Sequence, residues 1–273
     1  MHNSHFEGFT PEKVGAFSPE TLQGFDSEQL FNLDPSAFEG FTKKQVGAFS
    51  PEALQGFDSE QLLNLDPSAF EGFSKKQVGA LKPECFSNFT SSILENLKPS
   101  AMSGLLSEQV TEINDEYFAS LKPKQLAKIP ETAFGGVNAG QFNALSQRQL
   151  KKINNKKISE LSIKMVKDID AEAFAMLKPD AITGFTKQHL KKVSPDQLNA
   201  LQKDQIQAIG EKAIPGLKKK TLKNLDKATF ISFSPDQLDD FKFKQLKAVH
   251  TEFIEALNTD QQSAISRLTD LLT

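Results

Sequence analysis

Hydrophobic residues recur every eight positions along the whole chain. Counted from His2, the sequence divides into 34 octads without a single insertion. Position eight of the octad is apolar in 33 of them, and position five is apolar in all but the last two. Because these positions are three residues apart, they lie on one face of a short helix. The pattern predicts one short helix per octad, with both apolar residues in the core.

The polar positions of the octad resemble the two ends of a helix. Position one is mostly Ser, Thr, Asp, Asn or Lys, and 11 of the 13 prolines follow at position two. These are the residues preferred at the N-cap and at the first helical position. Gln occupies position four in 13 octads, where its side chain can close a capping box. Nine of the 15 glycines occupy position seven, where a left-handed turn would end the helix.

Longer repeats are built from the octads. Residues 18–49 and 50–81 differ at only four of 32 positions. Through residue 81, octads with Pro at position two and a small residue at position four, such as DPSAFEGF, alternate with octads that have Gln at position four, such as TKKQVGAF. A single octad is too short to be a stable helix alone, so its apolar face must pack against other octads. We therefore expect an all-α, elongated solenoid of about 34 short helices, with an even number of helices per coil, and two rather than four.

The two ends of the chain differ in pattern. After Asn258 and Thr259 no Pro or Gly interrupts the sequence. We expect an octapeptide-repeat solenoid over residues 1–257 and a capping helix over 258–273. Its apolar face is expected to comprise Ala264, Ile265, Leu268, Leu271 and Leu272. The first octad has an ordinary core pair, Phe6 and Phe9, and no such cap. This predicts either the C-terminal part of a longer array or a homodimer in which two N-terminal faces meet.

The composition adds few functional signals. Of 23 Phe, 20 fall at positions five and eight, which indicates core residues rather than an aromatic binding stripe. The single cysteine excludes an intramolecular disulfide and an all-cysteine metal site. No apolar run is long enough for a transmembrane helix, and the N-terminus has no signal-peptide pattern. We expect an extracellular or cell-surface location if the chain belongs to a longer secreted protein, and a cytoplasmic one otherwise.

Candidate catalytic and metal-binding residues are sparse. Cys85 has no His in its own octad or in the adjacent ones. His2 and His5 lie close together but lack a third metal ligand, and the Asp residues at position one are explained by N-capping. There is no Gly-rich phosphate loop, GxSxG or HExxH motif. The sequence thus favours a non-enzymatic protein without cofactor or metal.

The unit PSAFEGFTKKQVGAF and the octads SPEALQGF and SPDQLNAL resemble a family of tandem octapeptide arrays from predicted bacterial proteins. The resemblance covers essentially the whole chain, although Pro and Gly become rarer and Lys more frequent toward the C-terminus. Those proteins are often large and presumed secreted or surface-attached. The resemblance implies a scaffold or adhesion role with a protein or surface-polymer partner, and it provides no catalytic residue.

Charge is distributed unevenly along the chain. Residues 1–97 contain six Lys and 14 acidic residues, whereas residues 145–225 contain 17 Lys and Arg and eight acidic residues. A basic belt of this kind can bind nucleic acid or an acidic polysaccharide, although nearly all its cations are Lys and no aromatic residues are interleaved. A solvated face is the other interpretation, and the one we favour. The candidate polyanion-binding residues are Lys151, Lys152, Lys156, Lys157, Lys191, Lys192, Lys218, Lys219 and Lys220.

Overall fold

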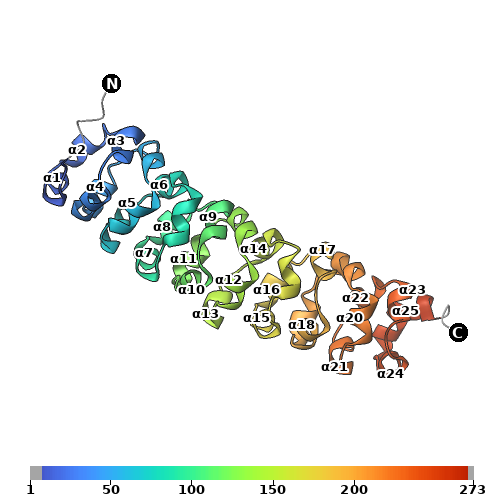
Figure 1. Cartoon of the computed structure of the whole chain (residues 1–273). Coiled ribbons are helices and arrows are strands. Elements are labelled where there is room, and N and C mark those ends of the chain that lie inside the picture. Colours follow the sequence, from blue (N-terminus) through green and yellow to red (C-terminus); the bar gives the residue numbers. More distant parts are fainter. Residues whose placement is uncertain (1–7, 270–273) are drawn as a thin grey trace. The chain divides into compact units, whose positions relative to one another are not determined.

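The computed structural model describes residues 8–269 and is all-helical over that range. The chain forms two compact units, one ending at Val137 and the other beginning at Asn138. We call residues 8–137 unit 1 and residues 138–269 unit 2. In Figure 1, unit 1 runs from blue to green and unit 2 from green to red. No β-strand occurs in the described range, which confirms the predicted all-α class.

Unit 1 consists of short helices joined by tight bends (Figure 1). In chain order they are α1 (Pro11–Gly15), α2 (Pro19–Leu22), α3 (Ser27–Phe31), η1 (Pro35–Gly40), α4 (Lys43–Val46), η2 (Ala53–Gly56), α5 (Ser59–Asn64), η3 (Pro67–Gly72), α6 (Lys75–Ala80), η4 (Pro83–Asn88), α7 (Ser91–Asn96), α8 (Pro99–Met102), α9 (Ser107–Glu112), α10 (Asp115–Ala119), α11 (Pro123–Lys128) and η5 (Thr132–Gly136), where η denotes a 3-10 helix.

Unit 2 has the same construction (Figure 1). Its helices are α12 (Ala139–Asn143), α13 (Gln147–Leu150), α14 (Asn155–Glu160), η6 (Met165–Asp168), α15 (Ala171–Ala175), α16 (Pro179–Ile182), α17 (Lys187–Leu190), α18 (Pro195–Asn199), α19 (Lys203–Gln207), η7 (Glu211–Gly216), α20 (Lys219–Lys223), α21 (Lys227–Phe230), α22 (Pro235–Asp239), α23 (Phe243–Leu246), α24 (Thr251–Glu255) and α25 (Thr259–Thr269).

The expected count of about 34 helices needs correction. Residues 8–269 contain 25 α-helices and seven 3-10 helices. Every octad from the second to the thirty-second forms one helix, but the last two octads share α25. In the octads of η1 and η3 the cap residue tightens the turn, because Asp34 and Asp66 each accept a hydrogen bond from the backbone N–H only two residues later.

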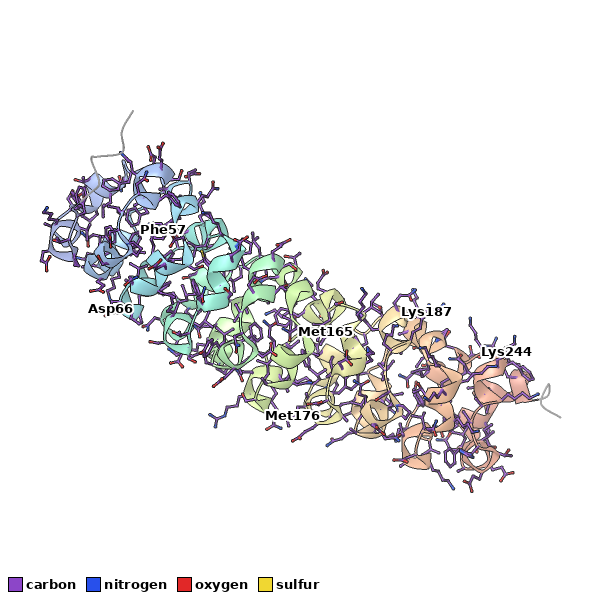
Figure 2. The ribbon with its side chains drawn as sticks, viewed as in Figure 1. Phe57, Asp66, Met165, Met176, Lys187 and Lys244 are labelled. Carbon is purple, nitrogen blue, oxygen red and sulfur yellow. The ribbon has the colours of Figure 1, made fainter. Side chains whose placement is uncertain are left out.

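The predicted core positions are buried. Position five is completely shielded in most octads, as at Phe38 and Phe70, and position eight is nearly so from Leu33 to Ile265. The rings of Phe38 and Phe57 pack edge to face with centroids 5.0 Å apart, and Phe57 lies inside unit 1 (Figure 2). Aromatic pairs favour this geometry. The phenylalanine excess is therefore core, as predicted.

The predicted caps are also present. The Asp26 carboxylate accepts a hydrogen bond from the Gln29 N–H at 2.8 Å, and Gln29 Oε1 accepts one from the Asp26 N–H at 2.9 Å. The same reciprocal pair joins Asp58 and Gln61. These bonds satisfy amide groups that a helix start leaves unpaired. The Asp residues at position one therefore act as caps.

The predicted role of glycine at position seven is wrong for all but the first octad. Among the described residues only Gly8 has a positive φ, so the other eight glycines at position seven do not end helices with a left-handed turn. Seven of them are required because another backbone lies against them. A Cβ on Gly72 would overlap the Lys43 carbonyl oxygen, and one on Gly40 would overlap that of Pro11. In both pairs the residues are 29 positions apart, and Gly56, Gly104, Gly136, Gly184 and Gly216 show the same relation.

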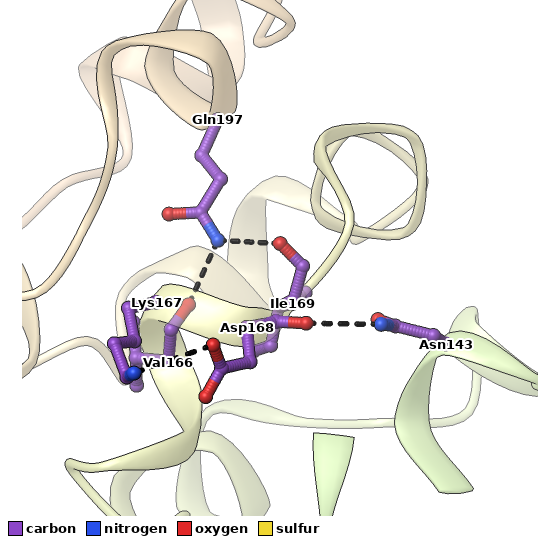
Figure 3. Close-up of polar contacts among 6 residues, drawn as sticks. All are labelled: Asn143, Val166, Lys167, Asp168, Ile169 and Gln197. Carbon is purple, nitrogen blue, oxygen red and sulfur yellow. Dashed lines mark hydrogen bonds and ion pairs between the residues drawn. The ribbon is translucent and has the colours of Figure 1, made fainter. Parts of the chain in front are cut away.

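Glutamine at position four forms a ladder between coils. Gln197 Nε2 donates to the carbonyl oxygens of Val166 and Ile169 at 2.7 and 2.6 Å (Figure 3). These acceptors lie 31 and 28 residues earlier, in the fourth preceding octad. Nine other glutamines at this position make the same kind of bond to a residue of their own unit, and His189 makes it through its ring. The glutamines are Gln45, Gln61, Gln77, Gln109, Gln125, Gln205, Gln237, Gln245 and Gln261.

The ladder corrects the predicted coil. Helices pack mainly against the helix three octads away, as α1 does against η1 and α17 against η7. The Gln bonds reach four octads back, over 28 residues. One coil therefore spans about three and a half octads. Neither two helices per coil nor any other even number is correct, because the 16-residue alternation in sequence does not determine the number of residues in a coil.

Helix α25 occurs where a capping helix was expected. Its Ile265 and Gln261 are buried, and Arg267 forms an ion pair with Asp239 of α22 at 2.8 Å. Ala264 and Leu268 are half-buried. Leu271 and Leu272 lie outside the described residues, as does Phe6 at the other end. The division into a solenoid over 1–257 and a cap over 258–273 stays a prediction.

Candidate polyanion-binding surface

Eight of the nine predicted lysines are exposed. Lys151 and Lys152 follow helix α13, and Lys156 lies in the first turn of α14. The others lie at the ends of α17 and α20; they are Lys191, Lys192, Lys218, Lys219 and Lys220. All of these side chains belong to unit 2 and are available to solvent.

Lys157 is the exception. It occupies position four of its octad, where other octads carry Gln, and only 2% of its surface is exposed. Its backbone N–H donates to the Asn154 side chain at 2.9 Å. A buried ammonium at this position belongs to the interior of the fold, so Lys157 is not placed to bind a polymer. The sequence alone does not show that Lys157 is buried and Lys156 exposed, unless position four of the octad is assigned to the core.

The ladder joins three of the lysine-bearing octads. His189 Nε2 bonds the Leu161 carbonyl oxygen at 3.0 Å, and Thr221 Oγ1 donates to that of Val193 at 3.2 Å. These contacts connect the octads that begin at residues 154, 186 and 218. The structure thus brings Lys156, Lys191 and Lys218 onto successive coils of unit 2, although they are far apart in sequence.

Unit 2 also has a hollow of about 540 Å³ that is lined by three lysines and no acidic residue. We call it the basic hollow. It lies between α14, α16, α17 and the start of η7. Its lining residues are Asn155, Lys156, Ser159, Thr183, Gly184, Phe185, Thr186, Lys187, Gly210, Lys212 and Ala213. Lys187 lies at the surface of the unit (Figure 2).

A second hollow in unit 2 has a different charge balance. Its lysines, Lys151 and Lys178, are accompanied by Glu172 and Asp204. Opposite charges of this kind compensate each other, whereas the cations of the basic hollow have no carboxylate among the lining residues. The basic hollow is therefore the better candidate for an anion site.

Sequence reasoning missed two of the three lysines in the basic hollow, Lys187 and Lys212. Lys187 lies 31 residues after Lys156, and Lys212 lies 25 residues after Lys187. Hydrogen bonds between neighbouring coils of unit 2 join residues at both of these separations. Knowledge of the coil length would have grouped them with Lys156. Gly210 was a further signal, since it stands at position one, where most octads have a capping side chain.

The histidine and cysteine residues in the described range have structural partners. His189 replaces Gln in the ladder: the Thr186 N–H donates to its Nδ1 at 3.2 Å, while its Nε2 contacts the Leu161 carbonyl. Burial lowers the pKa of His189, and the bond to Leu161 opposes this effect. Burial raises the pKa of the Cys85 thiol, which keeps it protonated and unreactive at neutral pH.

No cluster of three His, Cys, Asp or Glu side chains in residues 8–269 is arranged to hold a metal ion. The longest helix in the same range, α25, has 11 residues, and none is long and apolar enough to cross a bilayer. His2 and His5 lie outside the described residues.

Comparison with known proteins identifies no family. No protein-family model matches the chain, and no curated protein matches its sequence. Among solved structures, the leucine-rich repeat-containing protein LegL7 from Legionella pneumophila covers 78% of this chain and 78% of its own length. The identity is 12% and the TM-score 0.23, and a similarity this low carries no argument about function.

Proposed function

We propose that this chain is a non-enzymatic repeat scaffold that presents surfaces to protein partners, in a bacterial surface or matrix setting. The repeated residues support this proposal through their roles. Caps, core pairs, ladder glutamines and close-contact glycines maintain the fold, and the outward positions remain free to vary. Solenoids of this kind typically use such positions for binding.

The observation that carries the proposal is a pair of exposed apolar residues in unit 1. Phe31 is 57% exposed and Leu63 is 46% exposed. Both stand at position six, on α3 and α5, and these helices are joined by the bond from Gln61 Nε2 to the Phe31 carbonyl at 3.2 Å. Exposed Glu28 and Glu60 lie one turn earlier. An apolar pair bordered by carboxylates suits a partner with apolar and basic side chains.

Site-specific photo-crosslinking tests this proposal. A crosslinking amino acid at position 31 or 63 should capture the same protein in the native cell, whereas one at position 44 should not. The purified partner should then bind the wild-type chain at least tenfold more tightly than the double variant Phe31→Ser, Leu63→Ser. The matched control is Leu106→Ser, which changes another exposed apolar residue. Equal binding by the double variant and the control would contradict the proposal.

The second candidate function is polyanion binding, favoured by the charge of unit 2. Residues 138–273 contain 22 Lys and Arg against 16 acidic residues, whereas residues 1–137 contain 10 against 19. Heparin or DNA should bind with an affinity that falls steeply with salt. Reversing Lys218, Lys219 and Lys220 to Glu should weaken this binding at unchanged helicity. Absence of binding at about 0.1 M salt, where the Debye length is about 10 Å, would remove this candidate.

The burial of the core positions in the N-terminal coil leads us to propose a homodimer as a partner. Phe9, Phe17 and Phe25 stand at position eight but are only half-buried. Their rings form a row with centroid spacings of 5.5 and 5.7 Å. A second copy that covered this row would bury its exposed edges. Sedimentation of the wild type and of Phe17→Ser should show a dimer only for the wild type, and a wild-type monomer at all concentrations would exclude it.

A further inference from the structure

We propose that the basic hollow is a binding site for an acidic saccharide, with Lys156, Lys187 and Lys212 holding its sulfate or carboxylate groups. This inference rests on the second proposed function, and it names the site and the ligand class. Three ammonium groups from α14, α17 and η7 line one concave surface. They come from octads that are remote in sequence, so only the coiled chain assembles them.

The other lining groups select a saccharide. Ser159 and Thr183 donate their hydroxyl hydrogens to carbonyl oxygens within their own turns, at 2.7 Å each, and keep oxygen lone pairs as acceptors. Such acceptors, together with the amide of Asn155, suit the hydroxyl groups of a sugar. Phe185 is only 2% exposed, so no open ring is offered for stacking with a base. Nucleic-acid sites commonly rely on such stacking.

Gly210 lines the hollow and is exposed. A Cβ at this position meets no atom within 4 Å, in contrast to Gly72 and the other glycines that lie against a neighbouring backbone. Its φ of −61° is an ordinary value for any residue. Asp34 and Asp66 occupy the same octad position before the 3-10 helices η1 and η3, where they act as caps. Gly210→Asp should therefore fold normally while it adds a carboxylate beside the three lysines.

The experiment measures binding of a heparin-derived tetrasaccharide by calorimetry at low salt. Gly210→Asn adds nearly the same volume without charge, so comparison of Asp with Asn isolates electrostatics. We expect Gly210→Asp to bind at least tenfold more weakly than Gly210→Asn. Ser162→Asp adds the same charge at position one of another octad, outside the hollow, and should bind like the wild type. Lys212→Gln provides a second loss-of-binding variant, and thermal melts verify that each variant is folded.

Two further arms separate the possible failures. An oligonucleotide of equal charge should bind more weakly than the tetrasaccharide, and equal or tighter binding would overturn the assignment of the ligand. If long heparin binds but Gly210→Asp and Gly210→Asn bind the tetrasaccharide equally, the hollow is not the binding site. Polyanion binding by the basic belt would then stand without this inference. If neither long heparin nor the tetrasaccharide binds the wild type, polyanion binding and this inference are both wrong.

Discussion

The glutamine ladder makes the sharpest prediction about stability, and Gln109 is its best test. This side chain is completely buried. Its Nε2 donates to the carbonyl oxygens of Val78 and Leu81 at 2.9 and 2.7 Å, and its Oε1 accepts from the Leu106 N–H at 2.9 Å. Gln109→Ala removes all three bonds and leaves three backbone groups without this partner.

The expected loss follows from these three bonds. Each hydrogen bond contributes about 1 kcal/mol net, and a buried group left unpaired costs about 1–3 kcal/mol. Truncation also leaves a small cavity. We therefore expect Gln109→Ala to lower the free energy of unfolding by about 3–5 kcal/mol, a value at the upper end for a single substitution.

Gln29 is the matched control, since it closes the same capping box but is half-exposed. Gln29→Ala should cost only about 1 kcal/mol, as for the loss of a cap. Gln109→Leu fills the space without hydrogen bonds, and so separates packing from polar pairing. Urea unfolding followed by circular dichroism measures the differences, and hydrogen exchange at the Leu106 amide reports the local effect. Equal losses in Gln109→Ala and Gln29→Ala would refute the ladder.

Three further predictions concern the core, the close contacts and the histidine. Phe41→Ala should cost about 3–5 kcal/mol and Glu39→Ala within about 0.5 kcal/mol in urea unfolding, and equal costs would contradict the octad register. Gly72→Ala should destabilise the protein by about 1–3 kcal/mol, because its Cβ would overlap another backbone. Gly24→Ala should be neutral or stabilising, because its Cβ would meet an atom only at 3.5 Å. A larger loss of stability in Gly24→Ala than in Gly72→Ala would show that the coils do not touch at Gly72. Burial lowers the pKa of His189, so the stabilisation that neutral His189 provides is complete above the ordinary pKa of about 6.5 and is lost as the pH falls below 6.5 toward the lowered pKa. Thermal melts of the wild type and of His189→Gln should therefore diverge on acidification. Parallel pH profiles of the two melting temperatures would exclude this role of His189.

Local features of the fold could be predicted from the sequence because they are decided within eight residues. The pairing of Asp26 with Gln29 depends on a spacing of three, and so does the burial of Phe38 with Phe41. Neither requires knowledge of where the chain returns. This is why the predictions of the helix, its cap and its core face were correct in octad after octad.

The coil could not be predicted in the same way, because its length depends on the angles of the bends. The sequence shows periods of eight, 16 and 32 residues, but the contacts lie 28 to 31 residues apart. The second role of Gln45, which donates to Val14 and Phe17, therefore had no visible signature. The same gap hid the basic hollow, whose lysines are neighbours only after a full coil.

The coil length explains why the sequence alternates between two kinds of octad. With about three and a half octads per coil, each octad meets the third octad away, which is of the other kind, and the fourth, which is of its own kind. The octad 42–49 shows the result: Gly72, from an octad with Pro at position two, lies against its start at Lys43, and Gln77, from an octad with Gln at position four, bonds Val46 and Phe49 at its end. One kind supplies the close approach and the other supplies the hydrogen bonds. Through residue 81 a complete set of contacts therefore comes from two consecutive octads, which is the 16-residue unit seen in the sequence there.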